Sequence, residues 1–383
     1  SSFQQFISKQ QPPFTTTIFN TYRGADKMQY ATRSLLLLAS IMPAVFAFQL
    51  SKFAVHKSAV RYARPLFMMA DNDFDGYSAA TTFLFPGQGA QSVGMATSVV
   101  EEVPKAKELF DTASEILGYD LLQRCKEGPK DVLDSTAVSQ PAIFVSSMAA
   151  LEKMKMEMGE DAVAAATCAM GLSLGEYSAL CYAGALSFED GVKVTKARGE
   201  AMQAASDLTP TGMVSVIGLS SDKVKEICAA ASEKSGEKIQ IANYLCNGNY
   251  AVSGSIAACD VVDQIAKPDF GARMTVRLAV AGAFHTDFMA PAVSKLGEVL
   301  DTIEIKKPRI PVISNVDALP HSDPAVIKEN LKKQVTSPVL FENSVANLLE
   351  SGFEKGYELG PGKVVAGIFK RINKKAEIIN IEV

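Results

Sequence analysis

The pentapeptide Gly-Leu-Ser-Leu-Gly at 171–175 constrains the fold more than any other stretch of this chain. It follows a run of small apolar residues, AVAAATCAMG, which is typical of a strand buried on both faces of a parallel sheet. The residues after it, GEYSALCYAGAL, favour a helix. A serine at a sharp turn between a buried strand and a helix is the arrangement of a nucleophile elbow. The sequence therefore predicts an α/β fold with a hydrolase-like parallel-sheet core.

Residues 211–280 carry a different pattern. A strand-like run and a helical segment come first, followed by two strand-like runs separated by Asn247-Gly248, a dipeptide typical of hairpin turns. A second helical segment and a last strand complete the order βαββαβ, which is the ferredoxin-like unit. We therefore expect 211–280 to be a ferredoxin-like subdomain inserted into a larger α/β domain that covers 76–383.

The composition fits a globular chain that is long enough for this architecture. Its 383 residues are 48% hydrophobic and 21% charged. The six cysteines are scattered and none forms a CxxC pair, so we expect neither a disulfide framework nor a zinc site. We interpret them as buried free thiols of a reducing compartment. No cluster of metal ligands is evident, and the sequence predicts no metal and no cofactor.

The first 70 residues differ from the rest in charge. They hold eight Lys and Arg against one acidic residue, a net +7, which leaves −11 for the remainder of a chain whose total is −4. Residues 28–50 have the layout of a signal peptide, and residues 48–67 are basic and free of acids, as in a transit peptide. We expect 1–75 to be a targeting leader that is removed after import into a plastid, leaving no stable membrane association. Secretion or an N-terminal anchor is the alternative.

A serine in an elbow becomes a nucleophile only if a base reaches its hydroxyl. The GxSxG pattern alone is common by chance, but the predicted strand-to-helix turn makes Ser173 a strong candidate. Two histidines follow the leader. His321 lies in a turn-rich loop, DALPHSDP, whereas His285 lies where a predicted strand ends in the small-residue loop VAGAFH. We expect His285 to be the base and His321 to be a solvated loop residue.

Five motifs occur in order along the body of the chain: FLFPGQGAQSVGM, GLSLGEYSAL, KARGEAMQ, GAFH and ELGPGKVVAGIFKRI. Together they resemble the motifs of the malonyl-CoA:acyl carrier protein transacylases of fatty-acid synthesis. The resemblance covers nearly all of the chain after the leader, and that family also has an inserted ferredoxin-like subdomain. It implies that the chain is an acyltransferase, an [acyl-carrier-protein] S-malonyltransferase.

The resemblance also implies roles for individual residues. Ser173 matches the serine that becomes malonylated, and His285 matches the base that activates it. Gln334 matches a glutamine whose backbone carbonyl orients that histidine, in place of the acid of the usual triad. The backbone N–H groups of Gln88 and Leu174 match the oxyanion hole.

Two further matches concern the substrate. Arg198 lies on a predicted helix among lysines, where a cation would ordinarily face solvent. The resemblance implies instead that Arg198 holds the free carboxylate of malonate, because a guanidinium fits a carboxylate as a two-point fork. Phe284 matches a residue that fills space near the malonyl C2 and goes with malonyl rather than methylmalonyl, although a place in the core would suit it equally.

The reaction implied is a ping-pong exchange. The malonyl group passes from malonyl-CoA to Ser173 and then to the phosphopantetheine thiol of acyl carrier protein. Because the carrier is acidic, the basic clusters Lys332-Lys333 and 370–375 are candidate docking surfaces. We expect no nucleic-acid partner, and we expect the protein to act as a monomer.

Two other enzymes share part of this pattern. An α/β-hydrolase-type esterase also has GxSxG, but it would need an acidic triad member, and none is evident before His285. A stand-alone acyltransferase for a polyketide synthase would share the fold and chemistry and differ only in its carrier protein. A catalytically inactive scaffold is disfavoured because the candidate site residues are intact.

Overall fold

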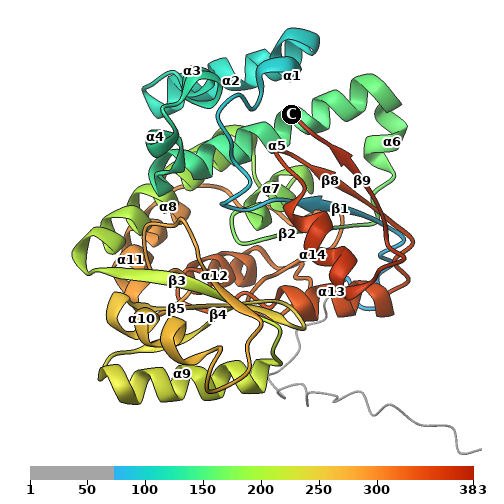
Figure 1. Ribbon diagram of the computed structural model, residues 1–383. Helices are drawn as coiled ribbons and strands as arrows, with labels where there is room; N and C mark the ends of the chain where they lie inside the picture. The colour runs from blue at the N-terminus through green and yellow to red at the C-terminus, as the bar shows by residue number, and fades with distance from the viewer. Residues whose placement is uncertain (1–72) are drawn as a thin grey trace, which may run out of the picture. The chain divides into compact units, whose positions relative to one another are not determined.

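The computed structural model describes residues 73–383, so the leader expected at 1–75 lies almost entirely outside the described residues. Two sheets organise this part of the chain (Figure 1). The first has five parallel strands and the second has four antiparallel strands. The predicted fold class, a parallel-sheet core with a ferredoxin-like second sheet, is confirmed.

The parallel sheet has the strand order β7-β2-β1-β8-β9, so that the strand nearest the N-terminus lies at its centre. Successive residues of this strand face opposite sides: Phe83 and Phe85 enter one hydrophobic cluster and Leu84 enters another. Both faces are therefore buried, which is the usual condition of a parallel sheet. The strands are β1 (Thr81–Phe85), β2 (Cys168–Gly171), β7 (Val312–Ile313), β8 (Lys355–Leu359) and β9 (Glu377–Ile381).

Helices cover both faces of this sheet. The cluster on one face includes α5 and α7, and the cluster on the other includes α13 and α14 (Figure 1). Residues 138–150 of α5 are buried without interruption, which makes this helix the centre of the first cluster. The helices of this part are α1 (Thr97–Glu102), α2 (Pro104–Leu117), α3 (Leu121–Glu127), α4 (Lys130–Asp134), α5 (Thr136–Met158), α6 (Glu160–Ala164), α7 (Gly175–Tyr182), α8 (Phe188–Leu208), η1 (Asp287–Met289), α11 (Ala290–Leu300), α12 (Pro324–Gln334), α13 (Phe341–Glu350) and α14 (Val364–Ile372).

The antiparallel sheet has the strand order β4-β5-β3-β6. Its helices, α9 and α10, pack on one face and enclose a separate hydrophobic cluster. Residues of the opposite face, among them Met213, Ala242 and Ala251, belong to the cluster of the parallel sheet, so the two sheets share a core there. The elements are β3 (Thr211–Ile217), α9 (Ser221–Ser235), β4 (Ile239–Cys246), β5 (Asn249–Ser255), α10 (Ile256–Ile265) and β6 (Met274–Arg277).

Local patterns misjudged some boundaries. The segment AVSQPAIFVSSMAALEKMKM predicts a helix that begins near Pro141, but α5 begins at Thr136 and contains Pro141 in its interior. The buried packing of this helix outweighs the hydrogen bond lost at the proline and the crowding by its ring. The strand expected across 162–171 is only four residues long, and its first part belongs to α6 and a turn. Among residues 73–383, no helix combines the length and apolar composition needed to cross a membrane.

Candidate active site

Ser173 lies at the turn between β2 and α7, with a φ of 52°. Two glycines make this tight turn possible. A Cβ on Gly171 would lie 1.9 Å from the carbonyl carbon of Gly175, and a Cβ on Gly175 would lie 2.2 Å from the carbonyl oxygen of Phe85. A positive φ at a residue other than glycine costs about 1–3 kcal/mol and persists only where the surroundings impose it. The sequence-predicted nucleophile elbow is therefore present, and it holds its serine in a strained conformation.

His285 approaches Ser173 from the segment that leaves the antiparallel sheet. Its Nε2 lies 2.9 Å from Ser173 Oγ, and its Nδ1 lies 2.8 Å from the backbone oxygen of Gln334. Because a carbonyl can only accept, Nδ1 carries the proton and Nε2 is free to accept one from the serine. Burial and the positive charge of Arg198 lower the pKa of His285 to about 4. The imidazole is consequently neutral at physiological pH, as a general base must be.

Arg198 projects from α8 into the same site and is 1% exposed. Its Nη2 donates to Ser173 Oγ at 3.0 Å and to Gln334 Oε1 at 2.9 Å, and its Nη1 donates to Gln140 Oε1 at 2.8 Å. Burial lowers its pKa from the ordinary value, although the guanidinium stays charged. No carboxylate of residues 73–383 forms an ion pair with it. A buried cation held only by neutral oxygens is well suited to receive an anion.

The loop after β1 lies against the elbow. A Cβ on Gly87 would lie 2.2 Å from the carbonyl oxygen of Leu172, so this close approach requires glycine. It brings the backbone of Gln88 to the start of α7, where Leu174 follows the serine. Within the described residues, neither of their backbone N–H groups donates a hydrogen bond. Both groups are therefore available to an oxyanion.

The remaining sequence candidates separate into two environments. Phe284 is 5% exposed and belongs to the large hydrophobic cluster next to His285. His321, the alternative base, lies in a loop where its Nε2 is 2.8 Å from Asp317 Oδ2. The structure therefore brings Ser173, His285 and Gln334 together and leaves His321 outside the group.

Besides Gln140, two other side chains at this site were not anticipated from the sequence. Asn315 accepts from the backbone N–H of Ser173 at 2.6 Å and donates to the backbone oxygen of Gly171 at 2.8 Å, so it braces the turn. Glu176 accepts from the backbone N–H of Asn315 at 3.0 Å and from Gln334 Nε2 at 2.6 Å. A signal for Glu176 exists in the sequence, because it is the only charged residue of GLSLGEYSALCYAGAL and lies only three positions after the serine.

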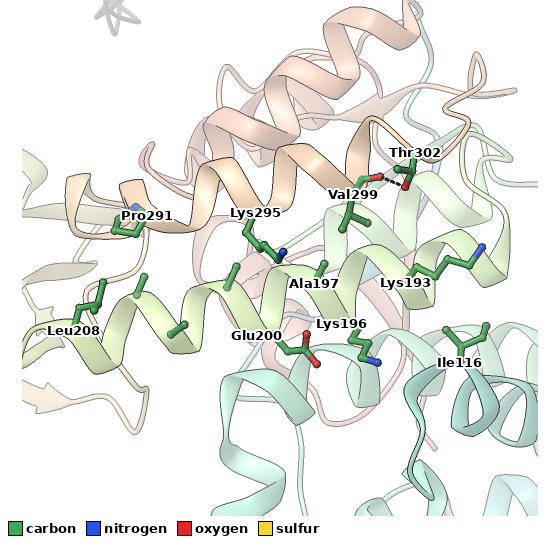
Figure 2. Close-up of a pocket in the computed structure, with 13 residues that line it drawn as sticks. Ile116, Lys193, Lys196, Ala197, Glu200, Leu208, Pro291, Lys295, Val299 and Thr302 are labelled. Carbon is green, nitrogen blue, oxygen red and sulfur yellow. Dashed lines mark hydrogen bonds between the residues drawn. The ribbon is translucent and has the colours of Figure 1, made fainter.

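Other features of the described part lie apart from this group. A cavity of about 730 Å³ lies between α8 and α11, lined by lysines and small apolar residues, and neither Ser173 nor His285 is among its lining residues (Figure 2). The cysteines are free, and five of the six are buried, as expected, whereas Cys181 is half-buried. Nowhere in 73–383 do three or more His, Cys, Asp or Glu side chains gather closely enough to hold a metal ion.

Comparison with known proteins places the chain in a family. Residues 82–382 match the model of the acyl transferase domain. The malonyl CoA-acyl carrier protein transacylase of Bacillus subtilis is 41% identical over 299 residues, which cover 78% of this chain and 92% of that protein. The transacylase structure from Coxiella burnetii is 34% identical with a TM-score of 0.75, covering 80% of this chain and 94% of that one.

A second similar structure was solved together with its protein partner. It is a malonyl-transacylase in complex with a type II PKS acyl-carrier protein, 31% identical with a TM-score of 0.74, covering 79% of this chain and 96% of that one. The matches extend over almost the full length of these relatives and include both sheets and the elbow. The chain belongs to the acyl transferase domain family and, within it, to the malonyl-CoA-acyl carrier protein transacylases.

Proposed function

We propose that the protein transfers the malonyl group of malonyl-CoA to the phosphopantetheine thiol of acyl carrier protein, through a malonyl ester of Ser173, and thereby supplies fatty-acid synthesis. The observation that carries this proposal is the position of Arg198. Its guanidinium is buried, lacks a carboxylate partner within the described residues and lies 3.0 Å from the serine hydroxyl. The relatives of the chain are malonyl-CoA-acyl carrier protein transacylases, which supports the same reaction.

The first half-reaction acylates the enzyme. Ser173 Oγ gives its proton to His285 Nε2 and attacks the thioester carbon of malonyl-CoA. The negative charge that develops on the carbonyl oxygen is stabilised by the backbone N–H groups of Gln88 and Leu174. The bond to sulfur then breaks, and His285 returns the proton to the departing CoA thiolate. Gln334 keeps the imidazole in the required orientation through its backbone carbonyl.

The second half-reaction runs in the reverse sense. The carrier-protein thiol gives its proton to His285 and attacks the malonyl ester, and the serine leaves with that proton returned to its oxygen. The product is a malonyl thioester on the carrier, and the enzyme regains its resting state. A pKa of about 4 for His285 keeps the imidazole available as the base in both half-reactions near neutral pH.

Arg198 supplies the substrate preference. Malonyl-CoA presents a carboxylate that the guanidinium can bind, whereas acetyl-CoA leaves the buried cation without an anion. An uncompensated buried charge of this kind costs about 2–5 kcal/mol, which is sufficient for strong discrimination. Phe284, beside the base, fills the space in which a larger C2 substituent would lie.

The alternatives fit less well. An esterase of the α/β-hydrolase type would place a carboxylate on the imidazole, but here His285 Nδ1 meets the backbone oxygen of Gln334. A polyketide-synthase acyltransferase would have the same site, and one relative is indeed in complex with a type II PKS acyl-carrier protein. The identity of the carrier that accepts the group distinguishes this second case.

Intact-mass measurement tests the proposal. The purified protein from about residue 71 is mixed with malonyl-CoA or acetyl-CoA, with and without carrier protein. We expect a malonyl adduct that is absent in Ser173→Ala and moves to the carrier when it is added. Release of CoA with no adduct would favour the hydrolase, and equal acetyl labelling would remove Arg198 from its role.

We also propose that residues 1–75 direct the protein to a plastid and that the processed enzyme is a monomer without stable membrane association. The basic leader with a signal-like and a transit-like part supports the first point. The monomer is supported by the site itself, which is built from groups of a single chain. Imaging a fluorescent protein fused to 1–75 in an alga with secondary plastids tests the address, and sedimentation of the processed protein tests the monomer.

A further inference from the structure

Glu176 is a buried carboxyl that the proposed mechanism does not use. It lies in the first turn of α7, is 3% exposed and forms no ion pair with a residue in 73–383. Its Oε2 instead accepts two N–H groups, from Gln334 Nε2 at 2.6 Å and from the backbone of Asn315 at 3.0 Å. Burying an acid without a cation beside it lowers stability, so the position calls for a functional explanation.

The amide of Gln334 connects this carboxyl to Arg198. Its Nε2 donates to Glu176 Oε2 and to the backbone oxygen of Ser173, the latter at 3.0 Å. Its Oε1 accepts from Arg198 Nη2 at 2.9 Å. An amide has two orientations that differ in which end donates. Reversing this one would turn its oxygen toward two acceptors and its NH₂ toward the guanidinium.

We propose that Glu176 is a positioning residue for Arg198: by fixing the amide of Gln334, it holds the guanidinium where it receives the carboxylate of the substrate. This inference rests on the proposed function, because it assigns to Glu176 a part in malonyl recognition. Glu176 thereby contributes to recognition of the substrate carboxylate and not to nucleophilic attack by Ser173. Acetyl-CoA, which has no carboxylate for Arg198, gains nothing from the arrangement.

The charge on Glu176 is expected to matter, because a carboxylate holds an N–H more strongly than a neutral acid does. Burial raises the pKa of Glu176 to about 7, and the charge of Asp317 adds to this effect, whereas the hydrogen bonds from Asn315, Gln334 and Ser314 lower it. The other ionisable groups around it are Tyr177 on the same helix, Arg198 on α8 and His285 beyond Gln334. Ionisation of Glu176 near pH 7 should therefore strengthen the hydrogen bond that it accepts from Gln334 Nε2.

The test compares Glu176→Gln with the wild type by the rate of Ser173 acylation at about pH 6 and about pH 8, on either side of the pKa of about 7. At the higher pH we expect kcat/KM for malonyl-CoA to fall about tenfold, the effect of losing one charge-assisted hydrogen bond. The slow acylation by acetyl-CoA should stay within about twofold. In the wild type, kcat/KM for malonyl-CoA should rise between the two pH values. In the variant this rise should be absent, and its kcat/KM at about pH 6 should equal that of the wild type.

A matched control is Glu358→Gln. Glu358 is another buried carboxyl, and it accepts the backbone N–H groups of Val365 and Ala366, both at 2.8 Å, at the start of α14. This variant should keep the malonyl preference and its pH dependence. Gln334→Met removes the amide and keeps the backbone carbonyl, so it should reduce kcat/KM for malonyl-CoA at least as much as Glu176→Gln does.

Two results would overturn the inference. One is an equal loss with both acyl donors, which would mean that Glu176 acts on the nucleophile or only on the fold. The other is a further drop in malonyl labelling when Glu176→Gln is added to Arg198→Ala, because a residue that acts through Arg198 has no effect once Arg198 is gone. If the wild type itself is not malonylated, it is the proposed function that fails. Thermal melting at the higher pH shows that the variant is folded, and it should melt no lower than the wild type.

Discussion

The hydroxyl of Ser173 has two partners with opposite properties. His285 Nε2, at 2.9 Å, accepts its proton, and Arg198 Nη2, at 3.0 Å, donates to its oxygen. The same guanidinium is the proposed receptor for the substrate carboxylate, so binding of malonyl-CoA and exposure of the nucleophile are linked at one side chain. A substrate that cannot engage Arg198 leaves that donor on the serine oxygen.

Arg198→Ala should alter selectivity more than reactivity. Loss of the carboxylate receptor is expected to reduce kcat/KM for malonyl-CoA by about 2–5 kcal/mol, roughly 30-fold to a few thousandfold. Acetyl-CoA should lose little or react faster, because no buried cation remains unpaired. Initial rates of Ser173 acylation with both donors measure this. Parallel losses for the two donors would show that Arg198 supports the site only structurally.

His285 should remain a base well into the acid range. Its pKa of about 4 lies below the ordinary value of 6.5, because burial and Arg198 disfavour the imidazolium. Acylation by malonyl-CoA is therefore expected to persist as the pH falls through 6 and to fail near 4. The Glu176→Gln variant is the best background, because titration near pH 7 is then absent. An acid limb centred between pH 6 and 7 in that variant would contradict the pKa of His285.

The pKa of Glu176 is raised, whereas that of His285 is lowered. The effect of Glu176 on the free energy of unfolding follows from the direction of this shift. Its pKa is about 7 in the folded protein against an ordinary 4.5, so the folded state favours the neutral acid. Stability from this group is complete below about pH 4.5 and is lost as the pH rises through 7. The cost above pH 7 is on the order of 3 kcal/mol. Glu176→Gln should accordingly raise the free energy of unfolding at pH 8, as measured by urea titration, and a decrease would argue against the shift.

At the scale of elements, the elbow depends on close backbone contacts between β1, β2 and α7. Gly175→Ala would place a Cβ 2.2 Å from the carbonyl oxygen of Phe85, and the backbone cannot yield there without moving the serine. We expect a loss of more than about 1 kcal/mol of stability together with most of the acylation rate.

A matched glycine in another helix serves as the control. Gly367 lies inside α14, where a Cβ would meet nothing within 4 Å. Gly367→Ala should therefore raise the free energy of unfolding by about 0.5–1 kcal/mol and leave the acylation rate unchanged. Equal behaviour of the two variants in melting and acylation assays would show that the contacts around Gly175 are not critical.

Sequence patterns predicted the elements whose identity depends on neighbouring residues. The elbow at 171–175 and the βαββαβ order could be inferred because turn glycines, the Asn247-Gly248 hairpin and apolar periodicity are local signals. The edge strand was harder. β9 lies at the edge of the parallel sheet with an alternating, partly exposed pattern. Its pairing with β8, and not its local sequence, defines it as a strand.

The site divides in the same way. Ser173 and His285 could be proposed from motif and context, whereas the carbonyl of Gln334 came only from the family resemblance. Asn315 and Glu176 could not be assigned, because their contacts join residues 139 or more positions apart. Such contacts become visible only once the two sheets are packed together.

At the scale of the whole molecule, we expect surface charge to determine where acyl carrier protein docks and how fast it associates. The basic cluster at the end of α14, formed by Lys370, Arg371, Lys374 and Lys375, is exposed, and none of these four side chains ion-pairs with a residue of 73–383. Lys332, from the other candidate surface, already pairs with Asp301 and Glu329. The structure thus favours the α14 cluster for an acidic partner.

Replacing all four residues of the α14 cluster by glutamine should slow transfer to acyl carrier protein by roughly tenfold or more at low salt. The difference should shrink as ionic strength rises, because surface charges are screened. Acylation of Ser173 by malonyl-CoA alone should be unaffected. Transfer rates at two salt concentrations test this, and a variant that transfers as fast as the wild type at low salt would move the docking surface elsewhere.

The central position of β1 has a consequence for the order in which the chain can fold. β1 pairs on one side with β2, Thr82 opposite Cys168, and on the other with β8, Leu84 opposite Glu358. Contacts between residues so distant in sequence form late and slowly. A chain that leaves a ribosome with its N-terminus first must therefore keep one side of β1 unpaired until β8 has been made. The nucleophile elbow packs against the end of β1, and its base is oriented by Gln334, so we expect a reactive serine to form only late in synthesis.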